Sequence, residues 1–304
     1  MSLAADNERE GLPEAGGAKA DRAFVVALSK GMHILEAFTP EVKWLGNAEL
    51  SERAGIPKPT VSRFTKALTA MGYLYYSTSR RQYRLGYCVL ALGYAGRSGS
   101  SISEVVRPYL QSLADEFNLH AALVGRDGTN VVHLEVAHSA NTFMTLRLET
   151  GSRIPLAGTA SGYALLSRIP LEERNYLFGY LKKRHEKHWN SLVTKIRAGI
   201  AEVEAQGYAT SRDGWLTDIN GVAVPIVPMG GSPVLAISCG AASKHLPLDK
   251  LAIVGERLVS VAATVMDAMA RHRSDFEARV THVQTEAGST QASRNSTEDR
   301  RPAN

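Results

Sequence analysis

Positive charge in this chain is concentrated in one short segment, whose chemistry is attraction to a polyanion. Residues 53–84 contain seven Lys and Arg and no Asp or Glu, so the net charge of +5 divides into +7 for this segment and −2 for the remainder. Cations gathered in this way neutralise phosphates and release the counterions condensed on nucleic acid, which gives a salt-sensitive affinity. A solvated basic face is the simpler interpretation of a charge run, but the apolar residues interleaved with these cations favour nucleic-acid binding.

Two short helices are predicted in and just before the basic segment. Residues 47–54 read as a helix that begins at an N-cap type residue, Asn47, and ends before Gly55. After a tight connection, a second helix opens at residues 58–60, where a proline in the first turn costs no internal hydrogen bond. The apolar stripe of this second helix, expected to face a small core, consists of Val61, Phe64, Leu68 and Met71.

The polar face of the second helix carries groups that can read a duplex. Arg binds guanine edges bidentately, whereas Thr, Ser and Lys bond to phosphates or to base edges near a helix start. Aromatic-rich runs at residues 73–76 and 82–85 flank a polar turn and predict a β-hairpin, or wing, with a basic tip on the phosphate backbone. The predicted DNA contacts are Lys58, Pro59, Thr60, Ser62, Arg63, Lys66, Arg80, Arg81 and Tyr83. Of these, Ser62 and Arg63 are assigned to base edges.

A further helix upstream completes a small helical core in this interpretation. Its inward-facing residues, chosen by helical spacing, are Val25, Leu28, Met32, Leu35 and Phe38. Composition marks both ends of the chain as disordered tails, because the first is rich in Gly, Ala and Glu and the last is polar. The predicted organisation is a tail at 1–22, a winged helix-turn-helix DNA-binding domain at 23–86, a linker helix at 87–102, a second domain at 103–273 and a tail at 274–304.

Length and composition limit the class of protein. The 304 residues, 44% of them apolar, are enough for cores in two domains. No apolar run approaches the roughly 20 residues that span a bilayer, and the first residues lack the basic and apolar regions of a signal peptide. Cys88 and Cys239 are each read as a small hydrophobe rather than as half of a disulfide. We therefore expect a cytoplasmic protein without membrane contact.

The second half alternates helices and strands in a way that predicts an α+β domain. Helices are expected at 106–117, 191–206 and 248–269, and strands at 121–125, 131–136, 142–148, 222–227 and 234–238. The strand at 142–148 alternates apolar and polar residues, which is typical of a half-buried strand. The predicted fold class is therefore α+β, with a mixed or antiparallel sheet and helices packed on it.

Four motifs follow one another in a characteristic order. They are Gly55 to Arg63 in the helix-turn-helix, Tyr83 to Gly86 at the end of the wing, Arg107 to Leu110, and Gly151 to Gly162. This order resembles the IclR family of bacterial transcriptional regulators over residues 24–271. The resemblance implies a winged-helix domain, a linker helix and a GAF-like effector-binding domain, assembled as dimers or tetramers. A dimer would place two recognition helices in successive major grooves, so the expected partners are a pseudo-palindromic double-stranded DNA operator and a small-molecule effector. We expect no cofactor.

The resemblance further implies which residues line the effector pocket. They are Met144, Leu146, Arg147, Gly158, Thr159, Ala160, Ser161, Asp213, Trp215, Gly221, Ser238 and Gly240. Independently, a Gly-Thr-Ala-Ser stretch that opens a helix leaves backbone N–H groups free to hold a carboxylate. The alternative is that Gly158 and Gly162 serve close packing alone and that Thr159 only caps the helix.

Two positions in this pocket are smaller than is common in the family. Gly221 stands where many members have Cys, and Gly240 where a Ser is frequent, which favours a bulkier effector such as an aromatic acid. Arg147 and Arg153 are candidates to pair with its carboxylate, although an Arg near a surface turn more often faces water.

Catalysis and metal binding find little support in the sequence. Ser161 occupies the fourth place of a Gly-bounded motif rather than the third, so it is not at the apex of a nucleophile elbow. His133 and His138 are five apart on a strand and are expected to point to opposite faces, while His185 and His188 are expected to face solvent. We predict no catalytic or metal-binding residue and no enzyme. A hydrolase that uses Ser161, or a DNA-binding protein that responds to no ligand, is the alternative.

Overall fold

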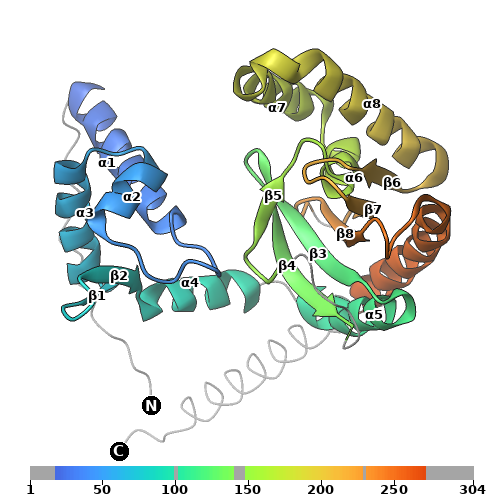
Figure 1. Ribbon diagram of the computed structural model, residues 1–304, viewed down its shortest axis with the longest axis horizontal. Helices are drawn as coiled ribbons and strands as arrows, with labels where there is room; N and C mark the ends of the chain where they lie inside the picture. Colours follow the sequence, from blue (N-terminus) through green and yellow to red (C-terminus); the bar gives the residue numbers. More distant parts are fainter. Residues whose placement is uncertain (1–17, 99–101, 140–147, 229–230, 272–304) are drawn as a thin grey trace, which may run out of the picture. The chain divides into compact units, whose positions relative to one another are not determined.

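The computed structural model describes residues 18–98, 102–139, 148–228 and 231–271 (Figure 1). The chain divides into two compact units, residues 1–96 and 97–304, and each is described here by itself. The division falls inside the segment predicted as a linker, residues 87–102.

The first unit is a three-helix core with a two-stranded wing (Figure 1). Its elements are α1 (Ala18–Glu36), α2 (Asn47–Ala54), α3 (Lys58–Ala70), β1 (Leu74–Ser77), β2 (Gln82–Leu85) and α4 (Tyr87–Ser98). The α2 helix begins one residue earlier than an Asn47 cap requires, because Gly46 is the N-cap and its N–H donates to the Glu49 carboxylate at 2.7 Å. Gly55 ends α2 in the left-handed conformation, with a φ of 65°, as its sequence position predicts.

The core of this unit forms where α1, α2 and α3 meet. Its buried side chains include Ile34, Leu45, Leu50, Val61 and Leu68. Phe64 packs against this cluster, so three of the four residues predicted for the α3 stripe face the core. Met71 does not, because it caps the C-terminus of α3 and the chain turns away at Gly72, where φ is 78°.

The inward stripe predicted for α1 is wrong over most of its length. Phe38 is buried and Leu35 packs against the core, but Val25, Leu28 and Met32 are exposed. The reason is geometric: the small core is reached only by the C-terminal part of α1, so its N-terminal turns extend beyond the helices that could cover them.

The second unit is one antiparallel sheet with helices on both faces (Figure 1). The strands are β3 (His120–Asp127), β4 (Asn130–His138), β5 (Arg153–Pro155), β6 (Ala209–Arg212), β7 (Ile219–Ile226) and β8 (Leu235–Ala242), in the order β5-β4-β3-β8-β7-β6. The helices are α5 (Ile102–Phe117), α6 (Ala160–Arg168), α7 (Leu171–Arg184), the short 3-10 helix η1 (Glu186–His188), α8 (Trp189–Gln206) and a helix over residues 248–271. The predicted α+β class is confirmed.

Each face of this sheet has its own core. On one face Leu110, Leu123 and Leu258 represent a cluster supplied by α5, the sheet and the helix over 248–271. On the other face Val124 and Leu165 belong to a cluster shared by the sheet, α6, α7 and α8. The expected strand at 142–148 lies almost entirely outside the described residues, and the short strands β5 and β6 were not predicted.

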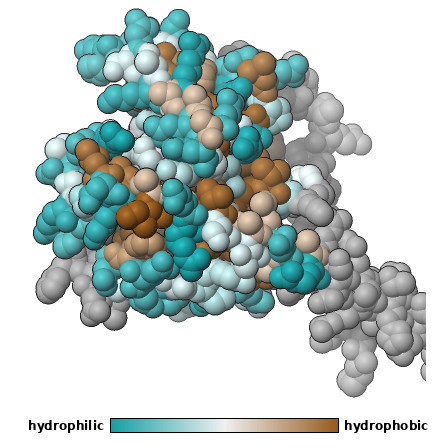
Figure 2. All heavy atoms as spheres, turned by 90° about the vertical axis from the view of Figure 1, so that its right-hand side faces the viewer, coloured by the Kyte–Doolittle hydropathy of each residue, from teal (hydrophilic) through white to brown (hydrophobic). Residues whose placement is uncertain are grey.

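None of the helices in the described part of the chain is long and apolar enough to cross a membrane. The helix over 248–271 exposes Leu248, Ile253 and Met266, and the face in Figure 2 carries brown hydrophobic patches separated by teal hydrophilic residues. Scattered exposed apolar side chains of this kind are ordinary on protein surfaces, so this face alone indicates no partner.

Two helical glycines differ sharply in the space around them and provide a test of the packing. A Cβ on Gly162 of α6 would lie 1.7 Å from the Leu156 carbonyl oxygen, whereas nothing lies within 4 Å of a Cβ on Gly179 of α7. We expect Gly162→Ala to lower the free energy of unfolding by about 2 kcal/mol or more. Gly179→Ala should instead raise it by about 0.5–1 kcal/mol. Urea unfolding followed by circular dichroism measures both, and equal effects would contradict the close contact at Gly162.

Candidate functional site

The outer face of α3 is a continuous basic surface. Lys58, Ser62, Arg63 and Lys66 are exposed on one uninterrupted helix, while Thr60 is half-buried. Among the described residues, no carboxylate lies within ion-pair distance of these cations. An exposed helix face with unpaired cations and hydroxyls has the chemistry of a major-groove reader.

Hydrogen bonds fix α3 against the start of α2. The Asn47 side-chain amide donates to Ser62 Oγ at 3.2 Å, and the Thr65 hydroxyl lies 3.5 Å from Asn47 Oδ1. Asn47 therefore acts between helices instead of capping its own. Ser62 keeps its exposed position but already accepts one bond from within the protein.

The wing adds two further cations and a packed tyrosine. Arg80 and Arg81 are exposed at the tip, and the Arg80 guanidinium lies 5.2 Å from the centre of the Trp44 ring. The Tyr83 ring is half-buried against Tyr76, with ring centres 4.8 Å apart, and its backbone pairs with Leu45. The Tyr83 ring thus packs the wing against the helical core, and its assignment to a phosphate stays a prediction.

A pocket opens on the second unit where α6 begins beside the sheet. Its cavity volume is about 70 Å³, and it is partly open to solvent. Seven residues predicted from the sequence line it: Thr159, Ala160, Ser161, Trp215, Gly221, Ser238 and Gly240. Lining residues that the sequence reasoning missed are His120, His133, His138, Leu148, Ile154, Ser211, Ile219, Asn220, Cys239, Ala241, Ala242 and His245.

The remaining predicted pocket residues lie elsewhere. Met144, Leu146 and Arg147 are outside the described residues. Gly158 and Asp213 do not belong to the described lining, which corrects both predictions. Gly158, with a φ of 85°, contacts the backbone of Gly214, and the Asp213 carboxylate accepts a bond from the Asp218 N–H at 2.8 Å. Both residues shape the loop that carries Trp215.

The N-terminus of α6 supplies the polar floor of the pocket. The Thr159 hydroxyl donates to the Pro155 carbonyl at 2.9 Å and accepts from the Gly162 N–H at 3.1 Å, so it caps the helix. The N–H groups of Ala160 and Ser161 belong to the first turn, which has no intrahelical acceptor. The positive end of a helix dipole is thus directed at the pocket, where it favours an anion.

A β-bulge brings three histidines to one wall of the pocket. His138 pairs with His120 across β3 and β4, but the register shifts by one between Leu123 and Val124, and His133 then pairs with Val124. The His120 ring centre lies 5.1 Å from that of His138 and 5.4 Å from that of His133. The prediction that His133 and His138 point to opposite faces is wrong, because an inserted residue inverts the alternation of a strand.

Burial disfavours the charged form of all three histidines. Burial, together with the neighbouring rings of His133 and His138, lowers the pKa of His120 from 6.5 to about 3. Burial also lowers the pKa of His133 and of His138. The Ser152 carbonyl lies 3.0 Å from His133 Nδ1, and since a carbonyl can only accept, this nitrogen carries the proton. Nε2 of His120 is buried without a hydrogen-bond partner in the described chain.

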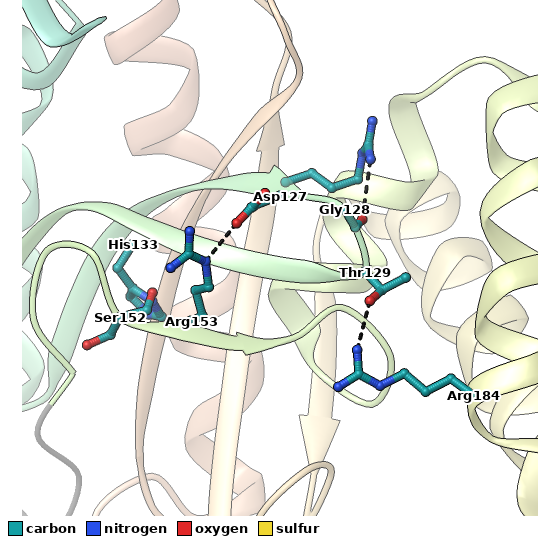
Figure 3. Close-up of polar contacts among 8 residues, drawn as sticks. Asp127, Gly128, Thr129, His133, Ser152, Arg153 and Arg184 are labelled. Carbon is teal, nitrogen blue, oxygen red and sulfur yellow. Dashed lines mark hydrogen bonds and ion pairs between the residues drawn. The ribbon is translucent and has the colours of Figure 1, made fainter. Parts of the chain in front are cut away.

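Arg153 forms an ion pair with Asp127. Figure 3 shows its Nε donating to Asp127 at the end of the β3–β4 hairpin, over 2.7 Å. On the same hairpin, Arg184 of α7 donates to the Thr129 hydroxyl at 3.1 Å (Figure 3). Arg153 is exposed and is not part of the described pocket lining, which favours the alternative that it faces water. No cluster of three or more metal-ligating side chains occurs among the described residues.

Comparison with known proteins assigns this chain, with its basic helix, its wing and its pocket beside the sheet, to a family. A family model described as the bacterial transcriptional regulator IclR C-terminal domain matches residues 97–267, and one described as the IclR helix-turn-helix domain matches residues 27–78. The chain belongs to the IclR family of bacterial transcriptional regulators. Membership agrees with the prediction that the chain is a regulator and not an enzyme.

Relatives of this IclR-family protein match nearly its whole folded part. It is 33% identical over 226 residues to the HTH-type transcriptional regulator TsaQ1/TsaQ2 of Comamonas testosteroni, a match that covers 74% of this chain and 81% of that protein. An IclR-family regulator from Brucella abortus has a similar structure, with a TM-score of 0.70, 36% identity and coverage of 84% and 96%. An IclR homolog from Microbacterium hydrocarbonoxydans, solved with 4-hydroxybenzoate, shares the fold at 19% identity, with a TM-score of 0.63 and coverage of 81% and 99%.

The lowered histidine pKa values give this regulator a pH-dependent stability. Between about pH 6.5 and pH 3, His120 binds a proton in the unfolded chain but not in the folded protein. The free energy of unfolding therefore has its full value above about pH 6.5 and falls as the pH drops toward 3. Each buried histidine contributes a slope of at most about 1.4 kcal/mol per pH unit. We expect His120→Gln to flatten the fall in the free energy of unfolding between pH 7 and pH 5. Urea titrations check this against the exposed control His188→Gln, which should change nothing.

Proposed function

We propose that this regulator binds a pseudo-palindromic operator as a dimer and that an aromatic carboxylic acid in the pocket alters this binding. The observation that carries the DNA part is the exposure of Arg63 and Lys66 on a helix whose other face is buried. The DNA-binding function itself follows from the family. The assignment of individual contacts, the dimer and the effector class belong to the proposal.

The exposed face of α3 enters the major groove in this proposal. Arg63 and Ser62 contact base edges, and Lys58, Thr60 and Lys66 contact phosphates together with Arg80 and Arg81 of the wing. A dimer places two such helices in successive major grooves roughly 34 Å apart, so its operator is pseudo-palindromic.

The uncovered apolar side chains of the first unit support a dimer. In α1, Phe24, Val25 and Leu28 are each exposed by more than half, and in α4 the same holds for Tyr87, Leu90, Leu92 and Tyr94. A small domain that leaves this much hydrophobic surface uncovered is typical of one that associates. A second copy of the chain could cover these side chains, and the resulting dimer would have the two-fold symmetry of a palindromic operator.

The pocket favours an aromatic acid as the effector. Its carboxylate is held by the N–H groups of Ala160 and Ser161, where the helix dipole supplies positive potential without a cation. Its ring lies among Leu148, Ile154, Ile219 and Trp215, and the small residues Gly221 and Gly240 leave room for it. The Microbacterium relative was solved with 4-hydroxybenzoate, which makes this acid the first probe to use.

Binding in the pocket regulates DNA binding through α4 in this proposal. An effector shifts an equilibrium between two arrangements only by the difference in its affinity for them. The α4 helix follows the wing and leads to the second unit. A change that the effector causes in the second unit therefore reaches the DNA-binding unit through α4.

Substitutions on α3 separate base reading from phosphate binding. We expect Arg63→Ala to weaken binding of the preferred operator by about 1–3 kcal/mol and to relax specificity at one base pair. Lys66→Ala should weaken all duplexes alike and reduce the salt slope by about one. Fluorescence anisotropy at several salt concentrations measures both. An even loss across all sequences for both variants would show that Arg63 contacts phosphate only.

A larger side chain at Gly240 tests the effector site. Gly240 lies opposite His120 on β8, and a Cβ there meets only the Asn220 carbonyl oxygen at 3.7 Å, so Leu extends into the pocket without a backbone clash. We expect Gly240→Leu to reduce 4-hydroxybenzoate or benzoate binding by at least about tenfold with little change in melting temperature, and Gly240→Ala to have a small effect. Isothermal titration measures both variants. Wild-type protein that binds glyoxylate or pyruvate alone would contradict the aromatic effector.

A further inference from the structure

Arg84 is a cation of the basic segment that has a different environment from the rest. It lies on β2 opposite Tyr75, and its guanidinium carbon is 5.1 Å from the centre of the Tyr75 ring, 5.8 Å from that of Trp44 and 5.4 Å from that of Tyr87. Its side chain is half-buried, and Nε is shielded from solvent with no hydrogen-bond partner in the described chain. Arg63, Lys66 and Arg81 are, by contrast, exposed to solvent.

The three rings around Arg84 come from three different parts of the first unit. Trp44 precedes α2, Tyr75 belongs to the wing, and Tyr87 is the first residue of α4. The rings of Trp44 and Tyr75 also meet edge to face, with centres 6.3 Å apart. A planar guanidinium has two flat faces that can lie on aromatic rings, whereas the ammonium of Lys is compact and strongly hydrated, so Lys is a poor replacement for Arg84 in this cluster.

The first turn of α4 is fastened at a second point beside this cluster. The Gly86 N–H donates to the Tyr73 carbonyl at 2.8 Å, and a Cβ on Gly86 would lie 2.0 Å from the Gly72 carbonyl oxygen. Farther along α4, Leu90, Leu92 and Tyr94 are exposed. Within one chain, two contacts therefore lie where α4 leaves the wing: the Gly86 hydrogen bond and the approach of Arg84 to the Tyr87 ring. Figure 1 shows α4 following the wing at this point.

We propose that Arg84 is a positioning residue: its stack on Trp44, Tyr75 and Tyr87 fixes the direction of α4 and, in a dimer, the half-site spacing at which both recognition helices bind. This inference rests on the proposed dimeric DNA binding. It assigns Arg84 a role that does not require a phosphate contact, although the residue belongs to the basic segment. Any change in the direction of α4 would then alter the spacing that the dimer accepts.

The test compares operators that differ only in the distance between half-sites. Full-length protein first selects a duplex from a random library, and variants of that duplex carry one or two base pairs more or fewer between the half-sites. We expect Arg84→Lys and Tyr87→Ala to lose spacing discrimination by about tenfold while both remain as dimeric as the wild-type protein in sedimentation, although Arg84→Lys keeps the charge. The salt slope of both should equal that of the wild-type protein. Arg81→Gln is the matched control, because loss of an exposed wing cation should reduce the salt slope by about one and leave spacing discrimination intact.

The outcomes that overturn this role are distinct from a failure of dimeric operator binding. If Arg84→Lys retains spacing discrimination while Arg84→Gln loses salt dependence, Arg84 is a phosphate contact. If Tyr87→Ala, a change at a side chain that is 75% exposed and so leaves the core intact, keeps the wild-type spacing preference, the proposed stack has no positioning role. Wild-type protein that selects only single half-sites would contradict the dimer itself.

Discussion

Burial of one face of α3 is the interaction on which the first unit depends. Val61 and Leu68 are packed between α1 and α2, and each such side chain contributes roughly 1.5–3 kcal/mol by leaving water. Turning the helix would expose them and bury unpaired cations, which costs several kcal/mol for each ion. The same packing that stabilises the domain therefore fixes Arg63 and Lys66 outward, where they can meet a duplex.

In the second unit the corresponding constraint is a sheet that must be covered on both sides. Two apolar clusters occupy its faces, and the pocket forms where α6 begins beside β7 and β8. The inserted residue in β4 has consequences for both faces. On one side of the bulge Glu135 turns toward α5, where it pairs with Arg107 at 2.8 Å. On the other side His133 joins His120 and His138 in the pocket wall.

Charges of the same sign serve different purposes in this regulator. Arg63 and Lys66 are exposed and unpaired in the described chain, which suits a surface that exchanges counterions for phosphates. Arg84 is stacked among aromatic rings, and Arg153 is paired with Asp127. The described lining of the pocket contains no Lys or Arg, burial lowers the pKa of its residues His120, His133 and His138, and a helix end supplies the positive potential.

The sequence by itself determined the features that depend on local spacing and composition. Helical periodicity placed α3 and its cations, and the glycine at residue 55 marked the end of α2. The alternation of helices and strands predicted the α+β class, and the order of motifs along the chain indicated the family. Tertiary structure decided which apolar residues of α1 find a partner, because spacing defines a face but not how far a small core extends. Tertiary structure also determined that the three histidines share one wall of the pocket. A single bulge reverses which face alternate residues of the strand point to, and the types of the neighbouring residues do not predict where a bulge occurs. The environments of Arg84 and Arg153 likewise depend on residues distant in sequence. Trp44 lies 40 positions before Arg84, and Asp127 lies 26 positions before Arg153, so neighbouring residues in the sequence do not reveal these contacts.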